Sequence, residues 1–338
     1  MNLKTENENS NINTDFSSMS FEEFCLELHK NKNKLSELLD QNGFIILKNT
    51  PARSVDDFKK VIGECLQWDP SYTVILPKKI TQWIRGYFSK LTNTTQYREY
   101  IDSVTMKLGS PESSIQGPHI EGGSLKNRSS LLSMFCLDAE SGSAQTGIYD
   151  LSAAFESLNQ DEKSKYECAY NEYRFHTRQL HPFEKYIPML LFRSFAKCYK
   201  RLSSTMDIIF KPTRMVVKHP RTKKRCLQIW PFLKNTSKAV HRAASEVFVD
   251  RVFLQLDSTA SHSNSDWNII DKDNNTIPWS EGEKTRLFKK VFKTAHIHSW
   301  SKGDILLIDN IRCAHGRMEG EETKREIIQL QCNYLEME

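Results

Sequence analysis

The sequence predicts a mainly β fold in which helices surround a core of strands. Short apolar runs typical of strands lie early in the chain and again at its end, and helical patterns lie between them. Strands far apart in the sequence would therefore pair to close one β core, with helices on its outside. A double-sheet jelly roll is one architecture built in this way, and periodicity alone does not select it.

The first half of the chain mixes helix and strand patterns. Residues 20–41 carry apolar side chains at helical spacing, and residues 54–66 begin with a serine cap and an acidic first turn, so both are predicted helices. The apolar runs at 43–50 and 129–137 are predicted strands. Residues 150–175 are predicted to be helical, most clearly at LSAAFESL.

The second half ends in strand-like runs. Residues 175–226 are basic and aromatic, and are predicted to be helical in part and then extended through RMVVKHP. Residues 241–252 and 280–295 are predicted to be mostly helical. The runs HIHSW, GDILLIDN and REIIQLQCNY that follow are predicted strands, because each is short and bounded by glycine or polar turns.

Composition indicates a globular cytoplasmic protein. The chain has 338 residues, and no run approaches the roughly 20 apolar residues that a membrane span needs. Residues 1–18 are rich in Asn, Ser and Glu and have no apolar segment, so they are predicted to be a disordered tail and not a secretory signal. Eight cysteines with no CxxC pair indicate reduced thiols.

Charge is unevenly distributed. The formal net charge is +5, yet residues 171–226 alone hold fourteen Lys or Arg against three Asp or Glu. This basic lobe falls in a segment, at about 152–226, that is predicted to be a partly helical insertion. It could attract an anionic partner, or it could be a solvated surface.

The motif GPHIEGG at 117–123 is a candidate metal site. In extended backbone, His119 and Glu121 leave the same face with Cα atoms about 6–7 Å apart, so both side chains can reach one ion. The flanking glycines allow the backbone to bend sharply. An ordinary His–Glu pair would give the same pattern.

A third ligand is available downstream in GDILLIDNIRCAHGR. A predicted strand runs out through Asp309 and Asn310 and leads to His315. Two histidines and one carboxylate form the facial triad of non-heme Fe(II) oxygenases, which leaves positions open on the metal. A structural zinc site would instead close with four ligands.

Thr146 and Arg325 are candidates for binding the far carboxylate of a keto-diacid. A guanidinium offers a fork of donors that matches a carboxylate, and a hydroxyl can assist it. Arg325 lies ten residues beyond His315, across one polar turn, so it could point into the same cavity.

Five segments, in this order and spacing, resemble the taurine dioxygenase superfamily of Fe(II)/2-oxoglutarate oxygenases. Within it the chain most resembles the syringomycin-biosynthesis-type hydroxylases, and clavaminate synthase is a more distant relative. The resemblance covers roughly residues 35–335, within one predicted domain of 19–338. The segments are LLDQNGFIILKNTPARSVDDFKKVI, GPHIEGG, QTGIYDLSAAFESL, FKTAHIHSWSKGDILLIDNIRCAHGR and REIIQLQC.

The resemblance implies a double-stranded β-helix, or distorted jelly roll, and a set of site residues. His119, Glu121 and His315 would hold Fe(II). 2-Oxoglutarate would chelate this iron, and O₂ would bind at the remaining position. Arg325 and Thr146 would bind the far carboxylate of 2-oxoglutarate. The implied reaction is hydroxylation of an unactivated C–H of an amino acid or amino-acid-derived substrate in natural-product biosynthesis, either free or tethered to an acidic carrier protein. Because Glu121 is present, hydroxylation or desaturation is favoured over halogenation.

Several alternatives stay open. Some family members have a second arginine where this chain has Gln329, and Lys324 is a neighbouring candidate for the role of Arg325. His296 and His298 form a rival metal pair at i and i+2. Asp309 and Asn310 are expected to pin the turn before His315, and Cys136 and Cys313 are expected to be packing residues.

Two other functions compete with the oxygenase. The chain could be a binding or regulatory protein that kept the fold and lost turnover. The basic lobe also raises a nucleic-acid demethylase, but no nucleic-acid-binding module is found, and the aromatics of the lobe are read as core.

Overall fold

Two facing antiparallel sheets form the core of the computed structural model, which describes residues 15–70, 78–92, 99–102, 104–108, 117–201, 204–249, 265–318, 320–321 and 324–337. The smaller sheet has the order β14 (Ala295–His298), β5 (Thr146–Asp150), β16 (Cys313–Arg317). The larger sheet has the order β1 (Phe44–Leu47), β15 (Ile305–Asp309), β4 (Asn127–Ala139), β17 (Arg325–Glu336), β3 (Thr105–Leu108), β2 (Glu99–Tyr100).

The space between the two sheets is apolar over much of its length. Met134, Leu306 and Ile327 of the larger sheet meet Ile148 of the smaller one. Because side chains alternate along a strand, the next residues of the larger sheet face the other way. The distant strands β4, β15 and β17 pair as neighbours, which confirms the predicted mainly β fold with a jelly-roll core.

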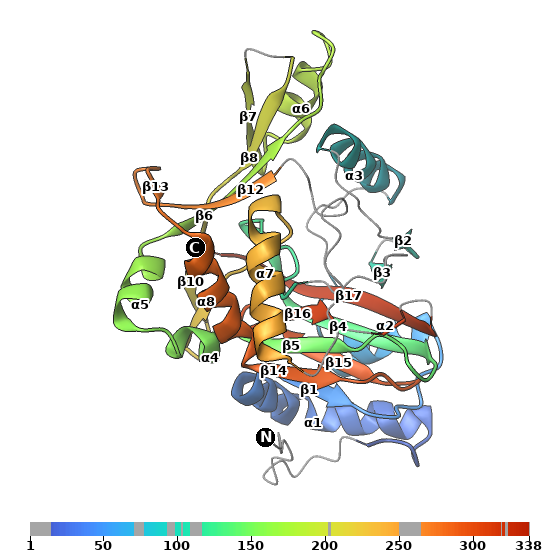
Figure 1. Ribbon diagram of the computed structural model, residues 1–338. Helices are drawn as coiled ribbons and strands as arrows, with labels where there is room; N and C mark the ends of the chain where they lie inside the picture. The colour runs from blue at the N-terminus through green and yellow to red at the C-terminus, as the bar shows by residue number, and fades with distance from the viewer. Residues whose placement is uncertain are drawn as a thin grey trace.

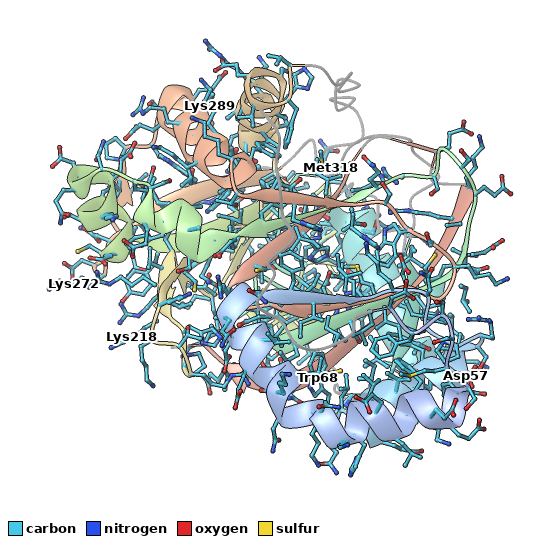
Figure 2. All side chains as sticks on the ribbon, turned by 90° about the horizontal axis from the view of Figure 1, so that it is seen from below. Asp57, Trp68, Lys218, Lys272, Lys289 and Met318 are labelled. Carbon is cyan, nitrogen blue, oxygen red and sulfur yellow. The ribbon has the colours of Figure 1, made fainter. Side chains whose placement is uncertain are left out.

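Helices cover the outer face of the larger sheet (Figures 1 and 2). They are α1 (Phe21–Asn42), α2 (Val55–Lys60) and a π-helical turn, η1 (Val61–Cys65). Ser54 forms a capping box at the start of α2, as its serine and acidic first turn predict, and Ser20 forms another at the start of α1. Gly43 (φ 83°) ends α1 in the left-handed conformation and turns the chain into β1.

A third sheet and the remaining helices form the other half of the molecule. This sheet has the order β13 (Thr276–Ile277), β12 (Ser265–Ile270), β6 (Tyr170–His176), β8 (Met206–Phe210), β7 (Ala196–Lys200), with β9 (Thr213–Arg214) beside β6. β10 (Val216–Lys218) pairs with β11 (Arg225–Leu227). The helices are α3 (Lys78–Thr92), α4 (Leu151–Glu156), α5 (Gln160–Glu167), α6 (Tyr186–Leu191), α7 (Lys234–Val247) and α8 (Glu281–Phe292). Figure 1 shows β7, β8 and α6 as an arm that projects away from the core.

The predicted helix over 150–175 is wrong in its last part. The segment divides into α4, α5 and strand β6, whose residues are alternately half-buried and buried. β6 is a strand because β12, far along the chain, pairs with it from Tyr170 to Phe175. The basic segment 175–226 is helical in part, as predicted, with α6 as the one helix in its described part, and β10 lies in the predicted extended stretch RMVVKHP.

Other boundaries shift or hold. The predicted helix over 241–252 begins earlier, at Lys234, and ends at Val247, while the predicted helix over 280–295 ends at Phe292 and gives way to β14.

Residues 1–14 of the predicted tail lie outside the described residues. Phe16 at its end is buried and packs its ring on Phe24, with centroids 4.8 Å apart. No helix among the described residues is long and apolar enough to cross a membrane.

Candidate metal centre

The three predicted ligands meet in one buried cluster. His119 and Glu121 lie just before and within the turn that leads to β4, and His315 lies in the middle of β16. Each residue offers one ligand atom, and these three atoms lie within 4.8 Å of one another. All three side chains are at most 5% exposed. Two histidines and one carboxylate that can bind one face of a metal ion are a donor set suited to Fe(II).

Backbone pairing fixes the two histidines relative to each other. His119 and His315 form a bridge in which each amide N–H donates to the other residue's carbonyl over 2.9 Å. Nδ1 of His119 lies 3.0 Å from the Gly117 carbonyl, which can only accept, so Nδ1 carries the proton in this contact. Nε2 of His119 then keeps its lone pair for a metal. The ring of Phe232 packs edge-on against His119, with centroids 4.5 Å apart.

Asn310 holds the backbone of Glu121. Its Oδ1 accepts from the Glu121 N–H over 2.9 Å, and its Nδ2 donates to the Glu121 carbonyl over 3.0 Å and to the Ser129 carbonyl over 2.8 Å. The side chain of Asn310 is fully buried. Thus the residue expected only to pin the turn before His315 also joins the two chain segments that supply the cluster.

Replacing Asn310 by alanine is expected to lower the affinity for Fe(II) about 10- to 100-fold, because outer-shell partners orient metal ligands. Competition with a chromophoric chelator measures this affinity, and thermal unfolding shows whether the variant is folded. Asn268→Ala is the control: it removes a partly buried amide on β12 that contacts Glu172, and it should leave the Fe(II) affinity unchanged. Equal Fe(II) affinities for folded Asn310→Ala and the wild type would contradict this role.

Arg128 buttresses the same turn and was missed by the sequence analysis. Its guanidinium is 1% exposed, and Nη1 donates to the Gly123 carbonyl over 3.3 Å while Nη2 donates to Oε1 of Gln228. Burial lowers the pKa of Arg128 to about 10, so the group stays charged at neutral pH. An arginine at a strand start gave no sequence signal, because the side-chain acceptor that holds it, Gln228, lies 100 residues along the chain.

Thr146 and Arg325 also meet, beside a tryptophan that the sequence analysis did not single out. Nη1 of Arg325 lies 3.3 Å from Oγ1 of Thr146 and donates to the Ala144 carbonyl over 2.7 Å. Nε1 of Trp300 donates to the same Thr146 hydroxyl over 2.9 Å. Lys324, the neighbouring candidate, instead forms an ion pair with Glu321 at 3.0 Å.

The buried amide of Gln329 bears on whether a polar ligand fits inside the core. It pairs with Met134 of β4 and lies two residues beyond Ile327, and both of those residues line the space between the sheets. Gln329 is fully buried, and neither its amide oxygen nor its nitrogen has a hydrogen-bond partner in the described part of the chain. A buried amide is costly unless it is paired. A keto-diacid such as 2-oxoglutarate, held between the metal cluster and Arg325, would offer acceptors for it.

The rival histidine pair has other partners. His298 is buried and contacts Asp304 at 3.2 Å. His296 packs on Phe44 with ring centroids 4.9 Å apart, and burial lowers the pKa of His296. Within the described residues, only His119, Glu121 and His315 form a cluster of three such side chains.

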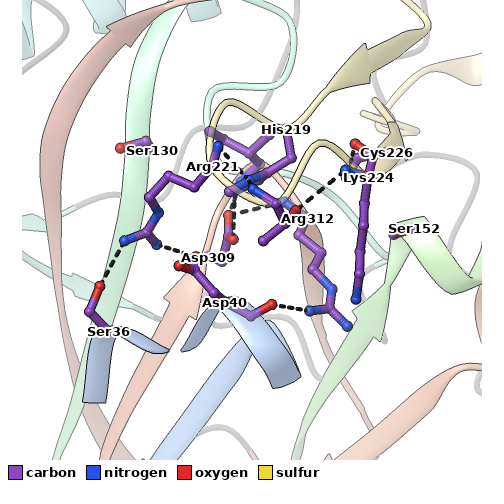
Figure 3. Close-up of polar contacts among 12 residues, drawn as sticks. Ser36, Asp40, Ser130, Ser152, His219, Arg221, Lys224, Cys226, Asp309 and Arg312 are labelled. Atoms are coloured by element: carbon purple, nitrogen blue, oxygen red, sulfur yellow. Dashed lines mark hydrogen bonds and ion pairs between the residues drawn. The ribbon is translucent and has the colours of Figure 1, made fainter. Parts of the chain in front are cut away.

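The remaining neighbours are structural, as expected. Oδ1 of Asp309 accepts from the backbone N–H groups of Ile311 and Arg312, and His219 contacts its Oδ2 at 2.8 Å, so Asp309 pins the turn (Figure 3). Cys136 and Cys313 are buried in the packed space between the sheets. Burial raises the pKa of the Cys136 thiol to about 12.

The basic lobe is partly neutralised by the rest of the chain. Arg221 contacts the carboxylate of Asp40 and the hydroxyl of Ser36, both over 2.8 Å (Figure 3). Arg225 contacts Glu167 at 2.7 Å. Some of the local excess positive charge therefore serves internal ion pairs.

The model of one protein family matches nearly the whole chain. Residues 8–331 match the family described as Taurine catabolism dioxygenase TauD, TfdA family. No curated protein matches the chain.

Solved structures with low sequence identity share the fold. PvcB, described as an Fe, alpha-ketoglutarate dependent oxygenase from an isonitrile synthetic pathway, is 12% identical, with a TM-score of 0.51 over 89% of this chain and 80% of PvcB. A taurine dioxygenase from Burkholderia xenovorans is 11% identical, with a TM-score of 0.50 over 90% of this chain and 81% of that one.

Proposed function

This chain belongs to the taurine catabolism dioxygenase (TauD, TfdA) family, and on that premise we propose that it hydroxylates an unactivated C–H of an amino acid or an amino-acid-derived substrate. The family makes it an oxidoreductase that uses Fe(II), 2-oxoglutarate and O₂, acting on a small molecule. The observation that carries the proposal is the buried His119, Glu121 and His315 cluster, whose ligand atoms lie within 4.8 Å of one another.

The proposed roles follow from the chemistry of each group. His119, Glu121 and His315 would hold Fe(II), which supplies O₂ activation coupled to the decarboxylation of 2-oxoglutarate. Arg325 and the Thr146 hydroxyl would bind the far carboxylate of 2-oxoglutarate by charge-assisted hydrogen bonds. The ring of Phe232 and the burial of the cluster would limit access of water.

Glu121 bears on the outcome of the reaction. A carboxylate ligand occupies the metal position that a halogenase leaves for chloride, so hydroxylation is proposed, with desaturation as its alternative. Within the family we propose the syringomycin-biosynthesis-type branch, which the chain most resembles in its five motif segments. We place the reaction in natural-product biosynthesis, within one domain of residues 19–338. The eight free cysteines support a cytoplasmic setting.

The substrate is proposed to be either free or tethered to an acidic carrier protein. Arg221 and Arg225 are engaged in ion pairs with Asp40 and Glu167, so a carrier would have to use other cations of the lobe. Lys223 and Lys224 are exposed beside them. These two lysines therefore make a sharper test of carrier binding than the arginines, whose loss would also disturb the body.

The iron-loaded protein is assayed with free amino acids and with the same amino acids tethered to an acidic carrier protein. We expect formation of succinate that depends on the substrate, with a product that gains one oxygen atom. If the carrier binds the lobe, Lys223→Glu with Lys224→Glu should lower turnover of the tethered substrate about fivefold or more and leave the free one unchanged.

Each contrary outcome removes a different part of the proposal. The exposed lysines Lys293 and Lys302 give a matched control pair when both are changed to Glu. Unchanged turnover of the tethered substrate in Lys223→Glu with Lys224→Glu would exclude binding of a carrier protein to the lobe. Binding of 2-oxoglutarate without succinate from any substrate would favour the non-catalytic binding protein.

A further inference from the structure

The arm formed by α6, β7 and β8 exposes a concentrated apolar surface. Phe183 is 86% exposed, Leu190 65% and Tyr186 60%. Three further exposed side chains of this surface are Ile187, Met189 and Tyr199. Large exposed apolar side chains scattered singly are normal, but five of these six lie within residues 183–190, and apolar side chains gathered in this way mark a binding surface. We call these six residues the arm tip.

The arm tip is not needed to hold the arm together. Phe192 is fully buried and packs its ring on Phe88 of α3 and on Phe195, with centroids 5.4 and 5.5 Å apart. β7 pairs with β8 along its whole length. Within α6, Pro188 faces inward while Tyr186 and Leu190 face solvent. The outward apolar face therefore contributes little to folding.

Positive charge surrounds the arm tip. Residues 178–210, which include the whole arm, hold six Lys or Arg and two Asp or Glu. Arg178 and Arg201 pair with the two acids, Glu184 and Asp207, and the other four cations remain. Arg193, Lys197 and Lys200 are exposed, and Nζ of Lys200 lies 4.4 Å from the centroid of the Tyr186 ring. A partner for this surface must therefore combine an apolar phase with negative charge.

We propose that the arm tip docks onto an anionic lipid surface. The arm projects from the body (Figure 1), and its most exposed apolar side chains lie at this projection. A fluid bilayer interface conforms to a projecting tip, whereas a folded partner would need a matching groove. Apolar side chains can enter the headgroup region while neighbouring lysines and arginines meet anionic lipids. A second copy of the chain would bring the same positive charges together.

Sedimentation with vesicles tests the proposal on the full chain. The vesicles are phosphatidylcholine alone, or phosphatidylcholine mixed with phosphatidylglycerol. We expect binding to the mixed vesicles that weakens as salt rises, because screening reduces attraction between exposed charges. Phe183→Ser with Leu190→Ser should lower the partition coefficient roughly tenfold or more, since burial of apolar side chains drives insertion.

Matched variants separate the contributions. Leu26→Ser changes a side chain that is 71% exposed on α1, at the far end of the molecule from the arm (Figure 1), and should leave binding unchanged. Lys197→Glu with Lys200→Glu should lower binding roughly tenfold or more by removing attraction to anionic lipid. Lys293→Glu with Lys302→Glu is the matched control for charge.

Three results would overturn the proposal. One is a wild type that binds neither kind of vesicle. Another is an equal loss of binding in Leu26→Ser and in Phe183→Ser with Leu190→Ser. The third is a wild-type dimer that Phe183→Ser with Leu190→Ser converts to a monomer in sedimentation velocity, which would make the arm tip a contact between copies of the chain.

Discussion

Replacing His315 by alanine is expected to abolish turnover that depends on 2-oxoglutarate and to lower Fe(II) affinity by at least about 100-fold, beyond the loss typical of an outer-shell change. His315 supplies one of three ligand atoms in the buried cluster, and its backbone is bridged to that of His119. Alanine keeps the two backbone hydrogen bonds and removes only the imidazole. Fe(II) competition with a chelator and succinate formation measure the two effects.

His296→Gln provides the control for a histidine outside the cluster. His296 lies on β14 and packs on Phe44, so its replacement should change neither Fe(II) affinity nor turnover. An Fe(II) affinity of His315→Ala equal to that of the wild type would contradict the proposed ligand set. So would a loss of affinity in His296→Gln as large as that in His315→Ala.

Replacing Arg325 by methionine is expected to raise the dissociation constant for 2-oxoglutarate by about 10- to 150-fold. Arg325 is half-buried, and a hydrogen bond to a charged group contributes about 1.5–3 kcal/mol. Fe(II) affinity without 2-oxoglutarate should stay unchanged, because Arg325 contacts Ala144 and Thr146 and is not part of the metal cluster. Anaerobic titration of the iron-loaded variant with 2-oxoglutarate measures the dissociation constant.

Two further variants make the Arg325 result specific. Arg325→Lys should recover only part of the affinity, since a single ammonium cannot reproduce the guanidinium fork. Lys324→Met removes the neighbouring cation, which contacts Glu321, and should bind 2-oxoglutarate as the wild type does. If Lys324→Met weakened binding as much as Arg325→Met, the assignment of Arg325 would be contradicted.

Sequence reasoning located the elements whose signals are local. The capped helices α1 and α2 and the apolar strands β1, β4 and β15 carry their patterns within a few residues. Strand β6 was read as helix because YNEYRFH becomes a strand only through pairing with β12, which lies far along the chain. Propensity is a weak guide where such distant pairing decides the conformation.

In the candidate site, too, residues with local sequence signals were predicted and those that depend on distant contacts were not. GPHIEGG and the downstream His315 are readable as a ligand set, and the fold brings them together. The clamp of Asn310 on Glu121 joins two turns that lie far apart in the sequence, so no spacing rule could find it. The inward direction of Gln329 depends on the strand register, which shifts between Glu326 and Ile327. One such shift exchanges the two faces of a strand.

The central claim is that His119, Glu121 and His315 hold an iron ion that 2-oxoglutarate can chelate. Anaerobic spectral titration of the purified protein, first with Fe(II) and then with 2-oxoglutarate, tests it most directly. We predict a visible metal-to-ligand charge-transfer band that saturates at one 2-oxoglutarate per iron. Folded, iron-loaded protein that develops no such band would contradict the claim.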